Sequence, residues 1–247
     1  MARSEKIIGL DIGYTKLAAL LAEIDQYDKI NVLGCYTIPA EGFEGGVVID
    51  LQKAMNTVSE CLTGLKNKSG LESLDKCAVF VGINGNHIQY LTSISAISVK
   101  NPQKGITEND IKTVLSQAQT LRLPADSQII HVFAKQFIID GQKGIKNPLG
   151  MFGNHLEIEA IIIIGMRTII ENILRIFKLL KLPCNALVLQ NHALANIVTN
   201  EKERNLGIGI IDIGGKTTIT VYKDNVLAYY KVLPIGGINV TNDIAIC

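Results

Sequence analysis

The sequence predicts an α/β fold, and two observations carry that prediction. A segment of strand, glycine turn and strand occurs twice, at residues 6–16 and 208–222. After the first copy, apolar patterns predict a second and a third strand, a helix and a further strand, which gives the order β-β-β-α-β. With 247 residues, the chain is long enough for one large domain or two smaller ones.

Both repeated segments have an aspartate at the end of their first strand. In the second copy, an apolar run leads to Asp212, and Gly214 and Gly215 follow, which permit the positive φ and the close backbone approach of a turn. In the first copy, Asp11 and Gly13 stand at the matching places. Two hairpins of one pattern indicate two related half-sites, each with a carboxylate at its mouth.

This pattern fits phosphate binding. Backbone N–H groups in a glycine turn form an anion-binding nest, and an aspartate from each side can hold the waters of a Mg²⁺ ion. A P-loop is excluded, because residue 210 is isoleucine where that motif needs glycine, and because a strand pattern rather than a helix follows Gly215-Lys216-Thr217. The alternative is a pair of ordinary β-hairpins with glycine turns.

Periodicity and turn residues place the other elements. Strands are expected at residues 16–24, 30–38, 77–83, 87–99, 128–139, 155–165, 185–189 and 226–233. Helices are expected after Asp50, after capping boxes of Thr107 with Asp110 and of Thr168 with Glu171, from Gln190, and near Asn239. Residues 140–151 are expected to form a glycine-rich loop, either functional or merely solvated, and the charged residues 201–204 an exposed link.

Composition narrows the classes of function. Hydrophobic residues make up 47% and charged residues 19%, as in a globular chain, and a net charge of +1 offers nothing to attract nucleic acid. Five cysteines without a Cys-x-x-Cys pair indicate buried thiols in a reducing cytosol. The first residues lack a signal-peptide pattern, and the most apolar stretch, residues 160–165, is too short to span a bilayer.

The hairpins, the strand order and the pair Gly236-Gly237 resemble the actin-like ATPase superfamily, whose nucleotide-binding fold is ribonuclease H-like. Within it, the chain resembles the FtsA family of bacterial cell-division proteins along its whole length. The matching runs are Asn101 to Thr107, Asp140-Gly141-Gln142, Asn147 to Met151 and Thr241 to Ala245. The resemblance implies three parts: a first subdomain (1A) of residues 1–84 plus 166–205, an inserted strand-helix-strand-strand subdomain (1C) of residues 85–165, and the start of a second subdomain (2A) at residues 206–247.

The resemblance also implies a function. It is that of an ATP-binding adaptor that polymerises like actin and tethers the FtsZ ring to the cytoplasmic membrane at the septum. The inserted subdomain would contact neighbouring copies and other proteins of the divisome. In the family, a C-terminal helix holds the protein peripherally on the inner face of the membrane. Members continue past position 247 with their FtsZ-binding and membrane-anchor parts, so we expect this chain to be a fragment, and at most a weak ATPase.

Family positions carry over onto specific residues. ATP would be bound by Asp11, Gly13, Thr15 and Lys16 of the first hairpin, by Asp212, Gly214, Gly215, Lys216, Thr217 and Thr218 of the second, and by Gly236 on the ribose side. Asp11 and Asp212 would hold Mg²⁺ through water. Gln190 would orient the attacking water, although a polar residue at the start of a helix explains it equally well.

The chain departs from the family pattern at the second hairpin. Relatives usually read Asp-Ile-Gly-Gly-Gly-Thr-Thr-Asp, whereas here Lys216 replaces the third glycine and Ile219 the final aspartate. If position 216 needs positive φ, a lysine there costs on the order of 1 kcal/mol, which an ammonium–phosphate contact would offset. Without a carboxylate at position 219, a Mg²⁺ partner is lost. We therefore expect weak or absent hydrolysis, and we assign no role to His192.

Two alternatives stay open. A small-molecule kinase would use the same cleft, but it would need a substrate-activating carboxylate for which the sequence offers no convincing candidate. An actin-like pilus-assembly protein would share the insertion, but it should lack the runs at 147–151 and 241–245.

Overall fold

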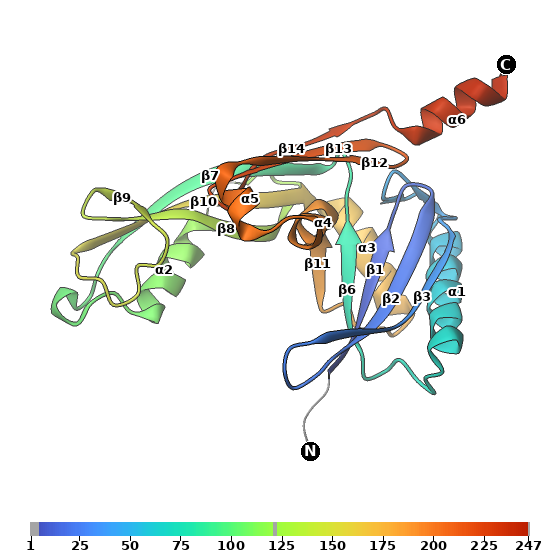
Figure 1. The fold of residues 1–247 in the computed structure, drawn as a ribbon, viewed down its shortest axis with the longest axis horizontal. Helices are drawn as coiled ribbons and strands as arrows, with labels where there is room; N and C mark the ends of the chain where they lie inside the picture. Colours follow the sequence, from blue (N-terminus) through green and yellow to red (C-terminus); the bar gives the residue numbers. More distant parts are fainter. Residues whose placement is uncertain (1–4, 121–122, 247) are drawn as a thin grey trace.

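The computed structural model describes residues 5–120 and 123–246, and three larger sheets organise them (Figure 1). The first sheet has the strand order β11-β6-β1-β2-β3. Its strands are β1 (Glu5–Ile12), β2 (Lys16–Ile24), β3 (Ile30–Pro39), β6 (Ala78–Ile83) and β11 (Ala186–Leu189). β1, β6 and β11 run parallel, and the other pairs are antiparallel. The predicted order β-β-β-α-β is confirmed, with an additional small hairpin of β4 (Phe43–Glu44) and β5 (Val47–Val48).

Two helices are near this sheet. In α1 (Leu51–Ser69), Lys53 donates its N–H to the Asp50 carboxylate at 3.0 Å, which confirms the predicted cap, and Gly70 at φ 68° ends the helix. Its buried stripe packs on β2 and β3. The second helix, α3 (Arg167–Leu179), starts where β10 ends. The capping box predicted at residues 168 and 171 is wrong, because the helix already begins at Arg167 and no side chain caps it. The N–H of Arg167 donates instead to the Asp126 carbonyl at 2.6 Å.

The inserted segment forms its own four-stranded sheet, with the order β7-β10-β8-β9. Its elements are β7 (Ile88–Ser98), α2 (Glu108–Ala118), β8 (Ser127–Ile139), β9 (Gln142–Ile145) and β10 (His155–Met166), with a short 3₁₀ turn, η1 (Pro102–Lys104). β9 corrects the prediction of an unstructured loop at 140–151. The sequence does not reveal this strand, because only Ile145 of its four residues is buried and the segment therefore lacks an alternation of apolar and polar residues. A separate apolar core joins this sheet to α2.

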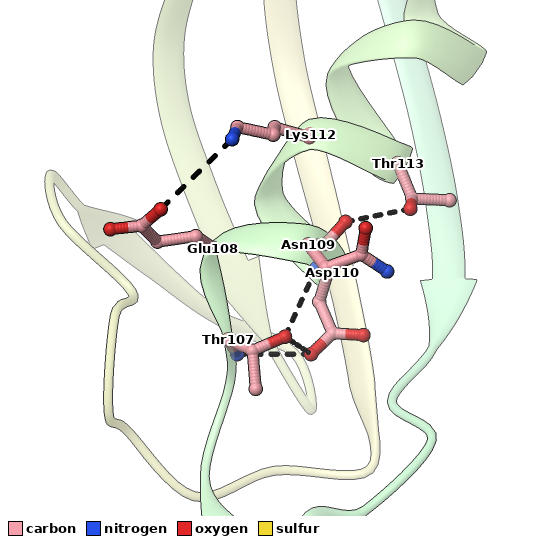
Figure 2. Close-up of polar contacts among 6 residues, drawn as sticks. All are labelled: Thr107, Glu108, Asn109, Asp110, Lys112 and Thr113. Atoms are coloured by element: carbon pink, nitrogen blue, oxygen red, sulfur yellow. Dashed lines mark hydrogen bonds and ion pairs between the residues drawn. The ribbon is translucent and has the colours of Figure 1, made fainter.

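The start of α2 carries the capping box that the sequence predicts (Figure 2). Asp110 donates its N–H to the Thr107 hydroxyl at 3.3 Å, and Thr107 donates its N–H to the Asp110 carboxylate at 2.9 Å. Each residue thereby satisfies a backbone donor that the first helical turn leaves unpaired.

Replacing Thr107 by alanine is expected to lower the free energy of unfolding by about 1 kcal/mol, because one N-terminal donor loses its acceptor. Urea denaturation would measure the change. The matched control is Thr113→Ala in the same helix, where the hydroxyl donates only to the already bonded Asn109 carbonyl at 2.6 Å. The control should stay within about 0.5 kcal/mol of the parent chain. Equal losses in both variants would contradict a specific cap.

The third sheet contains β12 (Ile208–Ile213), β13 (Thr217–Lys223) and β14 (Val226–Leu233), all antiparallel, and α6 (Gly237–Ile246) follows it. α6 begins at residue 237, slightly before the predicted start, and points away from the sheets (Figure 1). Two outward side chains of β12 are widely exposed, Ile211 at 63% and Ile213 at 70%. Within the described ranges, no helix is long and apolar enough to cross a membrane.

Two short helices, α4 (Gln190–Val198) and α5 (Glu201–Leu206), connect the first sheet to the third. The predicted exposed link at 201–204 is in fact α5. Asn200 and Glu203 make a reciprocal capping box at its start, which the run of charges concealed.

The inserted sheet also contacts the third sheet away from this connection. Lys146, next to β9, donates from its ammonium to the carbonyl of Asp224, in the turn between β13 and β14, at 2.9 Å. Both residues lie on the surface.

The cysteines only partly match the expectation of buried thiols. Cys61 and Cys77 are buried, whereas Cys35 is exposed. Cys247 lies outside the described residues.

Candidate functional site

The carboxyl ends of the three parallel strands meet at one edge of the first sheet, where ligands bind in open α/β sheets. β1 ends next to Asp11, β6 leads to Asn84, and β11 leads directly to Gln190. Gln190 donates from its amide to the Ile12 carbonyl at 3.1 Å. Gly82 leaves room for this arrangement, because a β-carbon there would lie 3.0 Å from Gln190 Cγ and 3.4 Å from Asp11 Oδ1.

The two hairpin turns face each other beside this edge. Gly13 donates its N–H to the Lys16 carbonyl at 3.0 Å, and Gly214 donates its N–H to the Lys216 carbonyl, also at 3.0 Å. The turns touch, because a β-carbon on Gly215 would lie only 2.4 Å from Tyr14 Cδ1. A cleft of about 290 Å³ lies between them.

Most of the predicted site residues line this cleft. These are Asp11, Gly13, Thr15, Lys16, Gln190, Asp212, Gly214, Gly215, Lys216 and Thr218. Thr217 and Gly236 are not among the lining residues. Gly236 packs against the back of the second turn, where a β-carbon would lie 2.5 Å from the Gly215 carbonyl oxygen, and the next residue donates its N–H to the Gly214 carbonyl at 2.7 Å. The placement of these residues is observed, and their roles remain predictions.

The backbone of the two turns differs from the expectation. Gly214 and Gly215 do not adopt positive φ, so close approach, as at Tyr14, is what position 215 requires. Lys216 is not among the residues with positive φ either, and the expected strain is therefore absent. Three other lining glycines have positive φ: Gly45 at 59°, Gly46 at 79° and Gly85 at 146°.

The electrostatics of the cleft centre on Asp11. Burial raises the pKa of its carboxyl group, the Lys16 ammonium opposes that rise, and the Asp212 carboxylate adds to it. The carboxylates of Asp11 and Asp212 therefore repel each other across the cleft. Among the described residues, no group of three or more His, Cys, Asp or Glu side chains could hold a metal ion. A cation bound here would take most of its ligands from water or from a bound anion.

A polar network that sequence reasoning missed joins the two sides. Asn84 donates from its amide to Asn191 Oδ1 at 3.2 Å and to the Thr218 hydroxyl at 3.1 Å, and it accepts from the Tyr230 hydroxyl. Tyr230 and Thr218 belong to the third sheet, whereas Asn84 follows a strand of the first. The available signal was the polar run that directly follows the apolar strand ending at Ile83.

His192 lies in a packed cluster beyond the cleft. Its Nδ1 lies 2.8 Å from the Tyr222 hydroxyl, and its ring packs on Phe133 with centroids 4.6 Å apart. His131 Nε2 accepts the N–H of Leu189 at 3.0 Å. Burial lowers the pKa of both histidines, and neither ring is among those that line the cleft.

Comparisons with known proteins agree with this architecture. The family model described as "SHS2 domain inserted in FTSA" matches residues 85–164. Cell division protein FtsA from Pseudomonas aeruginosa is 33% identical over 97% of this chain and 56% of the relative, and FtsA from Bacillus subtilis is 32% identical over 100% and 55%. FtsA from Escherichia coli is 30% identical over 97% and 56%. The chain spans about half the length of the curated relatives it matches.

Solved structures show the same fold. The PilM–PilN type IV pilus biogenesis complex matches with a TM-score of 0.65 and 12% identity, over 97% of this chain and 64% of the other. The ethanolamine utilization protein EutJ from Carboxydothermus hydrogenoformans matches with a TM-score of 0.51 and 14% identity, over 97% and 56%. At these identities, the likeness concerns the fold alone.

The mixed sheets, the inserted subdomain and the facing hairpins define a protein of the actin-like ATPase fold class. Within that class, the sequence similarity extends along the whole chain. The chain is similar to FtsA cell-division proteins along its whole length, and its residues 85–164 match the domain inserted in FtsA.

Proposed function

We propose that this chain supplies the phosphate-binding part of an actin-like cell-division scaffold, with ATP and Mg²⁺ as its ligands. The observation that carries the proposal is the pair of glycine hairpins facing each other across a cleft, each with an aspartate. The residues suit such a ligand: a β-carbon at position 215 would fill the space between the turns, and two carboxylates and two lysines line the cleft.

Each group has a distinct role in this proposal. Turn N–H groups and the hydroxyls of Thr15 and Thr218 donate to phosphate oxygens, and Lys16 neutralises their charge. Asp11 and Asp212 orient the waters of Mg²⁺, which supplies further neutralisation when bound. Gln190, whose amide is anchored on the Ile12 carbonyl, orients an attacking water. Thr217 and Gly236 support the second turn from outside the cleft. Turnover of ATP is at most weak.

The assembly role rests on the relatives, which carry the name cell division protein FtsA. We propose that the whole protein tethers the FtsZ ring to the cytoplasmic membrane, self-associates into filaments, and contacts other division proteins through the inserted subdomain. Membrane attachment would be peripheral, on the cytoplasmic face, through a C-terminal helix. The division into residues 1–84 plus 166–205, 85–165 and 206–247 belongs to the same proposal.

Nucleotide binding is tested by isothermal titration of the complete gene product with ATP, with and without Mg²⁺. Saturable binding that Mg²⁺ strengthens is expected, and no binding would overturn the nucleotide role. Capture of purified FtsZ tests the adaptor role. Selective capture of a pilus inner-membrane peptide would favour the pilus alternative, and phosphorylation of a sugar or acid at ordinary kinase rates would favour the kinase.

A further inference from the structure

Lys216 holds the same place in the second turn that Lys16 holds in the first. In each turn, the carbonyl of the lysine accepts the N–H of the glycine that opens the turn, Gly13 or Gly214, at 3.0 Å. The second turn is one residue shorter, because Ile12 pairs with Leu17 whereas Ile213 pairs with Thr217. The departure from the usual glycine thus creates a structural counterpart of Lys16.

The side chain of Lys216 reaches across the cleft. Its ammonium nitrogen lies 5.2 Å from the centroid of the Tyr14 ring, which comes from the first hairpin. A β-carbon on Gly45, in the loop before α1, would lie 3.1 Å from the same nitrogen. No salt bridge binds Lys216 to a carboxylate within the described part of the chain, and a cation–π contact at an accessible site is worth only about 0.5–1 kcal/mol. The ammonium can therefore move to an anion at little cost.

The net charge of the cleft lining depends on Lys216. Four charged side chains line it: Asp11, Asp212, Lys16 and Lys216. Nearby His87 adds little positive charge, because burial and the Lys216 ammonium lower its pKa. The lining is neutral with Lys216 and carries one negative charge without it, and a negative lining repels a phosphate chain unless Mg²⁺ offsets it.

We propose that Lys216 is a second phosphate-contacting cation, which lets this cleft hold a polyphosphate chain with less dependence on Mg²⁺ than a glycine at the same position would. The inference rests on the proposed nucleotide site and deepens it. It names the ligand as a chain of phosphates clamped between two lysines from opposite hairpins, and it makes position 216 the determinant of metal dependence.

The test compares Lys216→Met with the parent protein, using the complete gene product. Methionine keeps a long side chain on Tyr14 and removes the charge. Dissociation constants for ATP and for inorganic tripolyphosphate are measured in excess Mg²⁺ and in EDTA. On removal of Mg²⁺, the variant should lose at least about tenfold more affinity than the parent, which is the scale of one charge-assisted hydrogen bond. Lys216→Gly should behave like Lys216→Met if charge, rather than packing, is responsible.

The matched control is Lys223→Ala, which removes a positive charge from the exposed far end of β13, the strand that follows Lys216, outside the cleft. It should leave the Mg²⁺ dependence unchanged. Equal dependence on Mg²⁺ in the parent and both Lys216 variants would overturn the inference while leaving the nucleotide site intact. Failure of the parent to bind either ligand in Mg²⁺ would overturn the proposed function, and the inference with it.

Discussion

Replacing Asp11 by asparagine is expected to weaken Mg²⁺-dependent ATP binding by about 10- to 100-fold, because a charge-assisted interaction is worth about 1.5–3 kcal/mol. The same change should stabilise the ligand-free protein. Asp11 is half-buried, faces the Asp212 carboxylate and has a raised pKa, so its ionised form is less favourable in the folded chain than in the unfolded one.

The pH dependence gives the sign of this effect. Because the pKa of Asp11 in the folded chain lies above its ordinary value of 3.8, the folded state retains the proton longer as the pH rises. The parent therefore loses stability relative to Asp11→Asn above that value, and the difference is fully developed at neutral pH and absent in strong acid. Urea denaturation across this range measures it.

Asp243→Asn, on the exposed surface of α6, is the control for Asp11→Asn, and it should change neither affinity nor stability. A variant at position 11 that binds ATP and Mg²⁺ as the parent does would refute the role of this carboxylate. One that is less stable at neutral pH would refute the proposed repulsion.

Replacing Asn84 by alanine is expected to lower the free energy of unfolding by about 2–3 kcal/mol. The substitution leaves the Tyr230 hydroxyl and Asn191 Oδ1 without their Asn84 hydrogen bonds, and each polar group left unpaired in a buried site costs about 1–3 kcal/mol. Thr218 and Tyr230 come from the third sheet, so the loss should appear as weaker attachment of that sheet to the first.

Hydrogen exchange would locate this effect in β13 and β14, and denaturation would give its size. Asn86→Ala is the matched control, since Asn86 is two residues further on and exposed. A similar loss of stability in both variants, or unchanged exchange in the third sheet of Asn84→Ala, would show that the network does not join the sheets.

Local sequence patterns were sufficient to predict much of the fold. The repeated hairpins, the capped α1 and the capping box of α2 each depend on neighbours within a few residues, and such signals are legible in a single chain. The same holds for the carboxylates, because Asp11 and Asp212 stand at strand ends that the apolar runs mark. That they face one cleft required the comparison of two distant hairpins.

What the sequence did not predict depends on tertiary contacts. Asn84 is one asparagine among several, and only the packing of the third sheet on the first brings Tyr230 and Thr218 to it. β9 is too short and too exposed to show a period. The glycine usual at position 216 suggests a positive φ, but the turn here has an ordinary backbone at Lys216 and accepts a side chain.

The hydrogen bond from Lys146 to Asp224 has a mechanical consequence. The chain enters the inserted sheet after β6 of the first sheet and leaves it from β10 into α3, and Lys146, next to β9, also contacts the turn of the third sheet. Any swing of the third sheet that accompanies opening or closing of the cleft must either break that bond or pull β9 with it. This bond therefore couples the position of β9 in the inserted sheet to that of the β13–β14 turn, so a substitution at Lys146 would uncouple the two sheets at this point.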